Sequence, residues 1–421
     1  MSEPSLWLCT ARELGSHLCD AAIVHDGRCT WLGAMQDEDE YGDLSQTYGT
    51  VGPDLYGGAA GIALFLAELA ARTNDVVYAE RAEQGMRQAL RGAAALAGGE
   101  RGGYFTGVLG VAYAAARVAR AIDKPAFAEA ASSLLSDSSD EDDLANDIIR
   151  GAAGSIPALL TLSDWYSRPA LGARALALGD RLLLSARRHD DGSFSWSEEA
   201  DADAGGLALT GFSHGAAGVG WALRALHAAT GEPRFHDAAE RAFQYERQLF
   251  RPADDNWPDF RGTESVDDPA DCAVAWCHGA PGIALSRFAG SGAPTLGDRL
   301  DVEAAVRAAT QFVAQTADDP YADWSLCHGL SGICECLLGA AATFRIDAAR
   351  TVALDVARAA ADRFAASPGE WPCGVARGST PSLMLGLAGI GYFFLRLEAP
   401  ALATPLLPGA RTAFLVADRT K

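Results

Sequence analysis

Long apolar runs are missing from this sequence of 421 residues. No stretch approaches the ~18 to 20 consecutive apolar residues that a helix needs to cross a bilayer. The N-terminal segment also lacks the successive basic, apolar and small-residue zones of a signal peptide. We therefore expect a globular protein of the cytoplasm with no membrane span.

Positive charge is scarce. The chain has 34 Lys and Arg against 55 Asp and Glu, which gives a formal net charge of −21 and a pI near 4.7. Nucleic acids and anionic membrane surfaces repel such a protein, so we expect no nucleic-acid partner, while a cationic or neutral substrate remains open. The most acidic run, which starts at Ser136, predicts an exposed loop.

The cysteines are also not even in number, as a complete set of disulfide pairs would require. Nine cysteines are an odd number in a long chain that we expect to lie in the cytoplasm, which does not indicate a disulfide framework. In the cytoplasm, clustered Cys and His more often indicate metal binding or catalysis. Cys334 and Cys336 fall in an apolar helical pattern, where a buried thiol is usual, and Cys272 is a candidate additional ligand. The full set is Cys9, Cys19, Cys29, Cys272, Cys277, Cys327, Cys334, Cys336 and Cys373.

What the sequence does contain is a repeat. A Gly-x-x-Gly pair opens an apolar, helix-like run seven times, at intervals of 44 to 64 residues, near or above the upper end of the periods of repeat proteins. Between successive pairs lies a second helical pattern with one charged and one apolar face. The seven segments begin at Tyr56, Phe105, Ile149, Ser213, Cys277, Cys327 and Met384.

These alternating patterns predict an all-α fold. The runs after the glycine pairs carry few charges and are expected to form inner helices, while the amphipathic runs form outer ones. Seven such pairs indicate an α/α toroid of about fourteen helices, in which glycine lets the entrances of the inner helices approach closely. We assign the seven-repeat toroid to residues 51–421, and one or two outer helices to residues 1–50, within a single domain.

The residue directly before each glycine pair lies at one rim of this predicted ring. Those seven residues include three histidines, two of which follow a cysteine. Two Cys thiolates and one His nitrogen suit zinc and leave a fourth tetrahedral position open, although spacing alone does not decide whether His278 or His328 completes the set. In order, the seven positions are Gly57, Thr106, Arg150, His214, His278, His328 and Leu385.

An open zinc with two sulfur ligands favours thiol chemistry. Coordination removes the proton of a substrate thiol, which is mostly protonated at neutral pH, and holds a thiolate nucleophile. Activation of water for hydrolysis is the alternative. Loops rich in aromatic and acidic residues precede the fourth, fifth and sixth glycine pairs, and we interpret them as the frame of a cleft. Arg287, in the fifth inner run, either points into the ring or pairs with an acid.

The segments "GFSHGAAG", "AWCHGAPGI", "SLCHGLSG" and "GLAGIGYFFLRL" resemble the lanthionine synthetase C-like family, and most closely the cyclase portion of two-function lanthipeptide synthetases. The resemblance implies an α/α toroid with a zinc held by Cys277, Cys327 and His328. It implies that His214 is the catalytic histidine and that Asp147 orients it or tunes its proton affinity.

Two positions depart from the stand-alone cyclases of that family. An Arg four residues before the first zinc cysteine is replaced by Ala273, and a Tyr directly after that cysteine is replaced by His278. Loss of the arginine removes a group that would stabilise an enolate. His278 retains the ability to donate a proton or hydrogen bond, so it is a third candidate catalytic residue.

The resemblance implies a zinc-dependent cyclase. Cysteine thiols of a ribosomally made precursor peptide would add to dehydroalanine or dehydrobutyrine and close (methyl)lanthionine rings, and a separate protein would act as dehydratase. Glutathione addition and a non-catalytic, zinc-stabilised peptide-binding toroid remain alternatives. Glycosidases and zinc prenyltransferases also use α/α toroids, but a glycosidase would rely on paired carboxylates and would not need two Cys-His pairs.

Overall fold

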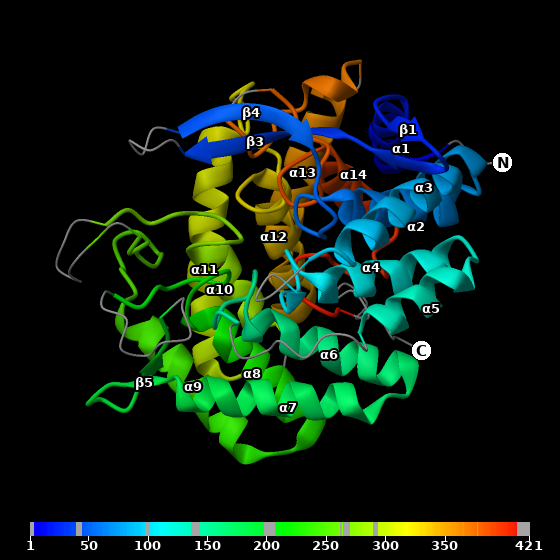
Figure 1. Ribbon diagram of the computed structural model, residues 1–421. Helices are drawn as coiled ribbons and strands as arrows, with labels where there is room; N and C mark the ends of the chain where they lie inside the picture. Colours follow the sequence, from blue (N-terminus) through cyan, green and yellow to red (C-terminus); the bar gives the residue numbers. More distant parts are fainter. Residues whose placement is uncertain are drawn as a thin grey trace, which may run out of the picture.

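A computed structural model shows the arrangement of the chain (Figure 1). It describes residues 4–410 apart from 39–43, 97–100, 136–143, 198–206, 262, 264–269, 289–293, 365 and 377. The acidic run that is expected to form an exposed loop lies mostly outside these residues. In the described part of the chain, no helix combines the length and the apolarity that a membrane span requires.

The seven predicted inner helices are present, each starting directly after the first glycine of a pair. They carry few charges and are buried over most of their length, which explains why the sequence shows apolar residues on every face. They are α2 (Ala59–Thr73), α4 (Val108–Ala121), α6 (Ala152–Tyr166), α8 (Ala216–Thr230), α10 (Ala280–Ser286), α12 (Leu330–Phe344) and α14 (Leu387–Glu398).

Six amphipathic helices follow inner helices and form the outer layer, and the N-terminal helix α1 (Leu6–Asp20) packs against α14 as the seventh outer helix (Figure 1). The beginning of the chain thus completes the last repeat, and the predicted α/α toroid is confirmed. The other six are α3 (Val76–Ala93), α5 (Pro125–Leu134), α7 (Pro169–Leu184), α9 (Pro233–Gln248), α11 (Leu296–Thr316) and α13 (Asp347–Phe364).

Backbone hydrogen bonds close the ring at the rim where the inner helices begin. The turn before each inner helix donates an N–H to the carbonyl of the next turn, and the last turn donates back to the first. The seven bonds run from Tyr56 to Phe105 (2.9 Å), Phe105 to Ile149 (3.0 Å), Ile148 to Ser213 (2.9 Å), Ser213 to Cys277 (3.0 Å), Cys277 to Cys327 (3.2 Å), Cys327 to Met384 (2.9 Å) and Met384 to Tyr56 (3.0 Å). Residues far apart in sequence therefore become neighbours around one circle.

The second glycine of each pair is required by a close backbone approach. A Cβ atom at Gly332 would lie only 2.0 Å from the carbonyl oxygen of Leu326, which is less than any real contact allows. The equivalent glycines of the other six repeats would place a Cβ 1.8 to 2.3 Å from the carbonyl six residues earlier. Glycine is therefore what lets each turn fold back onto the first turn of its inner helix.

The C-terminal segment packs against several inner repeats. Carbonyl oxygens of this segment accept hydrogen bonds from Tyr113, Thr161, Trp276 and Tyr392, which belong to four different repeats. All four donors are side chains, and these bonds tie residues 403–410 to the ring.

Among the described residues of the first fifty, 4–38 and 44–50, α1 is the one helix. After α1, two antiparallel hairpins follow: β1 (Ile23–His25) with β2 (Arg28–Thr30), and β3 (Leu32–Glu38) with β4 (Leu44–Thr50). Asp26 and Gly27 both have positive φ (49° and 67°), which is the turn geometry that closes a two-residue hairpin. A third, short pair joins β5 (Arg187–Arg188) and β6 (Phe194–Ser195), and a 3₁₀ turn, η2, covers Pro368–Glu370.

Candidate active site

The two cysteines that precede glycine pairs meet at the rim, together with one of the histidines. The ligand atoms of Cys277, Cys327 and His328 all lie within 4.8 Å of one another. The adjacency follows from the hydrogen-bonded circle, because Cys277 N–H donates to the Cys327 carbonyl. Two sulfur atoms and one imidazole nitrogen fit zinc, and they leave one tetrahedral position for another ligand.

Neighbouring groups hold these ligands in place. The Tyr56 hydroxyl donates a hydrogen bond to Cys327 Sγ at 3.0 Å, and Asp323 Oδ2 lies 3.5 Å from His328 Nε2. Asp323 is fixed in turn by the backbone N–H and the hydroxyl of Ser325. The hydrogen bond with Cys327 lowers the pKa of Cys277 well below its ordinary value, so this thiol is the readier of the two to ionise.

The three rim histidines occupy different environments although they share a sequence position. Gly279, directly after His278, has φ +81°, whereas the glycines at the matching positions of the other repeats are extended. The His278 side chain is only 2% exposed, against 25% for His214 and 43% for His328. Burial lowers the pKa of His278, which keeps its ring neutral.

His214 is paired with an acid from the preceding repeat. Its Nδ1 lies 2.7 Å from Asp147 Oδ2, and the Asp147 side chain is fully buried. Asp147 Oδ1 accepts a hydrogen bond from the Arg150 backbone N–H, which fixes the orientation of the carboxylate. This arrangement brings together the histidine and the acid that the resemblance pairs, from segments 67 residues apart.

The two candidate proton donors lie side by side. The rings of His214 and His278 stack with centroids 5.7 Å apart and an interplanar angle of 24°. His278 Nδ1 lies 3.8 Å from Asp259 Oδ1. His278 follows Cys277 directly, and the Ser213 N–H donates to the Cys277 carbonyl at 3.0 Å, so the turns that carry these two histidines adjoin the turn that carries Cys277.

Sequence reasoning missed four polar residues of this site, namely Tyr56, Asp259, Arg261 and Asp323. Asp259 and Arg261 lie in the loop before the fifth glycine pair, which the sequence marks as part of a cleft frame without singling out a residue. Tyr56 stands two residues before the first glycine pair, at the position that holds Cys277 and Cys327 in their own repeats. Because Tyr56 has the same position in its repeat as these two cysteines, the sequence could have predicted that Tyr56 lies beside them.

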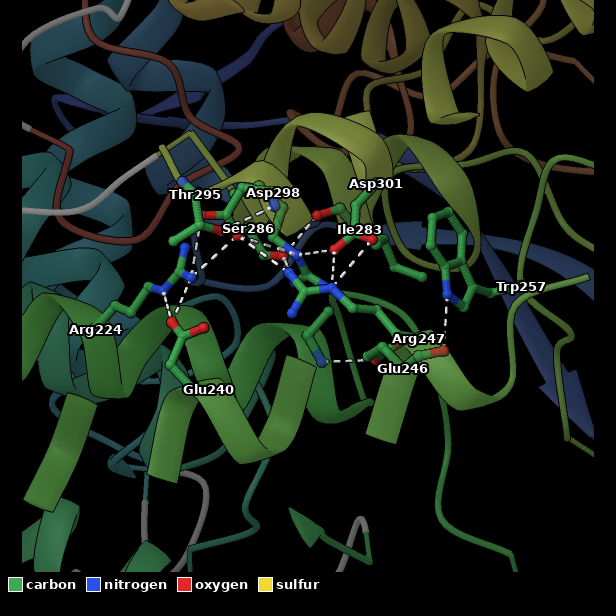
Figure 2. Close-up of polar contacts among 12 residues, drawn as sticks. Arg224, Glu240, Glu246, Arg247, Trp257, Ile283, Ser286, Thr295, Asp298 and Asp301 are labelled. Atoms are coloured by element: carbon green, nitrogen blue, oxygen red, sulfur yellow. Dashed lines mark hydrogen bonds and ion pairs between the residues drawn. The ribbon is translucent and has the colours of Figure 1, made fainter. Parts of the chain in front are cut away.

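A buried charge network supports the turn that carries His214 (Figure 2). The Glu246 side chain is fully buried, and its Oε1 accepts hydrogen bonds from the backbone N–H groups of Gly211 (3.2 Å) and Ala217 (2.8 Å), on either side of His214. The Glu246 backbone carbonyl also accepts the indole N–H of Trp257 at 2.9 Å. One residue of α9 thus anchors both the His214 turn and the start of the loop that carries Asp259.

The same network resolves the alternatives for Arg287. Its Nε donates to Asp301 Oδ2 at 2.9 Å, so the side chain pairs with an acid. Arg247 donates to the same oxygen, while Arg224 reaches Asp298 from α8, as Figure 2 shows. These ion pairs tie α8, α9 and α11 together beside the site.

The remaining cysteines are outside the cluster. Cys272 is half-buried and lies with its thiol 3.8 Å from Asp254 Oδ2, so it does not join Cys277. Cys334 and Cys336 are fully buried in α12, as expected for packed thiols. Of the predicted site residues, the structure therefore gathers Cys277, Cys327 and His328 in one group and His214, Asp147 and His278 in an adjoining one.

Comparison with the solved structure of nisin cyclase agrees with this architecture. The solved structure of nisin cyclase superposes with a TM-score of 0.62 at 18% identity, covering 82% of this chain and 89% of that chain. A possible member of the GH105 family from Klebsiella pneumoniae subsp. pneumoniae MGH 78578 gives a TM-score of 0.48 at 12% identity, over 94% and 93% of the two chains. No curated protein sequence matches. The family described as lanthionine synthetase C-like protein matches residues 49–410, and the chain therefore belongs to the lanthionine synthetase C-like family.

Proposed function

We propose that this protein is a zinc-dependent lanthipeptide cyclase, which joins a cysteine thiol of a peptide to a dehydroalanine or dehydrobutyrine of the same peptide. The observation that carries the proposal is an open ligand set of two cysteines and one histidine beside the His214–Asp147 pair. Membership of the family supports a cyclase activity. The substrate would be a ribosomally made precursor peptide that a separate dehydratase has modified.

Cys277, Cys327 and His328 would hold the zinc. Asp323 lies on the Nε2 side of the His328 ring, which leaves Nδ1 to face the metal and gives the carboxylate the role of orienting the ring. Tyr56 would steady the Cys327 thiolate through its hydrogen bond. When bound, zinc supplies a positive charge that keeps the substrate thiol ionised at neutral pH.

Ring closure forms one S–C bond at the β-carbon of the unsaturated residue. The π electron pair of the C=C bond moves toward the amide carbonyl oxygen, and a proton must then reach the α-carbon, so that the peptide mass does not change. Asp147 accepts the Nδ1–H of His214, so when this ring is protonated its second proton lies on Nε2, the nitrogen that does not face the acid, and that proton is the one available for the α-carbon. We assign proton donation to His214, with His278 as the adjoining alternative donor.

The test uses a dehydrated peptide that contains one cysteine, the zinc-loaded protein and an alkylating reagent that counts free thiols. We expect loss of the alkylatable thiol without a change in peptide mass. A Cys272→Ala variant, which alters a thiol outside the cluster, is the matched control and is expected to behave as wild type. Thiols that stay alkylatable with zinc-loaded protein would contradict the proposal. In a parallel reaction with added glutathione, a peptide mass gain equal to glutathione would indicate the intermolecular reaction instead.

A further inference from the structure

The proposed reaction creates a negative charge that none of the residues assigned so far stabilises. When the thiolate adds to the unsaturated residue, negative charge develops on the amide carbonyl oxygen. His214 and His278 are assigned to donate a proton to the α-carbon, and the three metal ligands are assigned to hold the zinc that binds the thiolate sulfur. A hydrogen-bonding cation beside the metal ligands would stabilise that oxygen, since such donors act most strongly where charge develops in the transition state.

A rigid loop brings one cation to this rim. Asn256 Oδ1 accepts the Ala280 N–H at 2.8 Å, which ties the loop to the start of α10, and the Thr210 hydroxyl donates to the Pro258 carbonyl at 2.6 Å, which ties it to the turn before α8. The Asp259 N–H donates to the Asp271 carbonyl at 2.8 Å. Asp259 is therefore held between the turn that carries His214 and the turn that carries Cys277.

Arg261 is fixed on this loop by Asp259. Its Nε lies 3.1 and 3.0 Å from the two carboxylate oxygens, and its Nη2 lies 2.6 Å from Oδ2. The remaining amino group, Nη1, has no bonded partner among the described residues, and the side chain is 59% exposed. Asp259 also faces His278 Nδ1 at 3.8 Å, so the pair stands over the residue adjacent to Cys277.

The charges around Arg261 agree with this placement. Its pKa is raised first by the hydrogen bonds and charge of Asp259, and also by the nearby sulfur atoms of Cys277 and Cys327. The guanidinium therefore lies close enough to both cysteines for their negative charge to stabilise its protonated form. Arginine keeps its proton at any working pH, so it serves as a hydrogen-bond donor and not as the source of the α-proton.

We propose that Arg261 is a further catalytic residue that hydrogen-bonds the carbonyl oxygen of the unsaturated residue during thiol addition, with Asp259 as its positioning residue. This inference rests on the proposed cyclase function. In the step, the S–C bond forms, the π electrons shift toward the oxygen that Nη1 contacts, and a histidine delivers the proton to the α-carbon. Arg261 itself is unchanged at the end.

A binding measurement tests this role apart from turnover. Mercaptoacetate carries a carboxylate close to its thiol and imitates the negatively charged oxygen, whereas 2-mercaptoacetamide is its neutral counterpart. Calorimetric titration of both thiols into zinc-loaded protein is expected to show roughly tenfold tighter binding of mercaptoacetate, the scale of one charge-assisted hydrogen bond. Arg261→Gln should abolish that preference, and Arg261→Lys should retain part of it.

The matched control is Arg307→Gln. Arg307 forms a similar two-bond pair with Asp255 and has a similar exposed fraction, 57%, but the charges that raise its pKa are acids and not the cysteines. The preference is expected to survive in this variant with unchanged zinc content. Equal binding of the two thiols by wild type, or a preference that persists in Arg261→Gln, would overturn the role of Arg261.

Cyclisation kinetics separate this role from the proposed function. Arg261→Gln is expected to lower kcat by roughly tenfold to a hundredfold, with zinc content and helix content unchanged. Ring closure by this variant at the wild-type rate would overturn the role of Arg261 and leave the cyclase function standing. Preference for mercaptoacetate without cyclisation of any dehydrated peptide by wild type would overturn the cyclase function and reduce Arg261 to an anion-binding group.

Discussion

Glu246 offers a direct test of how the scaffold holds the site. Its carboxyl group is fully buried and accepts two backbone N–H bonds that flank His214, while its Oε2 atom has no partner among the described residues. Burial, opposed in part by Arg287, raises the pKa of Glu246 from its ordinary 4.5 to about 8. The perturbation is Glu246→Gln, which keeps the shape and an accepting oxygen but does not ionise.

The magnitude follows from proton linkage. Because the folded-state pKa is raised, the folded protein holds a proton that the unfolded chain has already lost between these two pKa values. The stabilising contribution of this proton is complete below pH ~4.5 and declines as pH rises toward about 8, by about 1.4 kcal/mol per pH unit for one group. Above pH 8, Glu246 no longer makes the free energy of unfolding depend on pH.

The assay is the free energy of unfolding in urea, measured for both proteins at several pH values between 5 and 8. We expect the wild-type minus Glu246→Gln difference to fall with pH by about 1.4 kcal/mol per unit or somewhat less. Glu246→Ala is expected to cost about 2 to 5 kcal/mol at pH 5, because two buried N–H groups lose their acceptor. Alanine does not ionise either, so this cost is expected to fall with pH along the same slope as for Glu246→Gln. Parallel pH profiles for wild type and Glu246→Gln would refute a raised pKa at this position.

Three further predictions concern the rim. Cys327→Ala should remove the zinc, expected at about one per chain in the wild type, and all cyclisation while circular dichroism shows unchanged helix content; metal analysis that finds full zinc in this variant would reject the ligand assignment. His214→Asn should slow ring closure by roughly 10² or more in a rate assay with zinc retained, the scale of general acid catalysis, and an unchanged rate would move the proton transfer to His278. Gly332→Ala should destabilise the protein by more than about 2 kcal/mol and weaken zinc binding, because the new Cβ overlaps the Leu326 carbonyl. Gly231→Ala, where no atom lies within 4 Å of the new Cβ, should cost only about 1 kcal/mol from its positive φ, and a similar loss of stability in both variants would contradict the close-approach argument.

The glycine pairs make the fold predictable from the amino-acid sequence. Each pair marks a turn that folds back onto a helix, and an overlap of that kind tolerates only glycine, so the same three-residue spacing within the pair is found in all seven repeats. The amphipathic and apolar patterns then separate outer from inner helices. The strand pairs β1–β2 and β3–β4 are not predicted, because short two-stranded pairs leave a weak pattern and the three residues of β1 are all exposed.

The candidate site is only partly predictable in this way. Positions counted from the glycine pairs predict that His214, Cys277 and His328 lie at one rim, because equivalent positions of the repeats lie at the same end of the ring. The same counting treats His278 as equivalent to its neighbours, whereas the positive φ of Gly279 accompanies a buried position for this ring. Asp259 and Arg261 lie in a loop outside the repeat register, where spacing carries no information about proximity.

The sequence by itself determined the repeat, the number of turns in the ring and the residue types that stand at its rim, since all of these depend on local periodicity and on steric limits at glycine. Spacing left open which histidine lies with the two cysteines, and only the family resemblance implied His328 there and the pairing of His214 with Asp147. The tertiary structure alone brings these groups together and buries His278 beside Asp259. Those choices depend on contacts between segments tens to hundreds of residues apart, which closure of the backbone hydrogen-bond circle brings together.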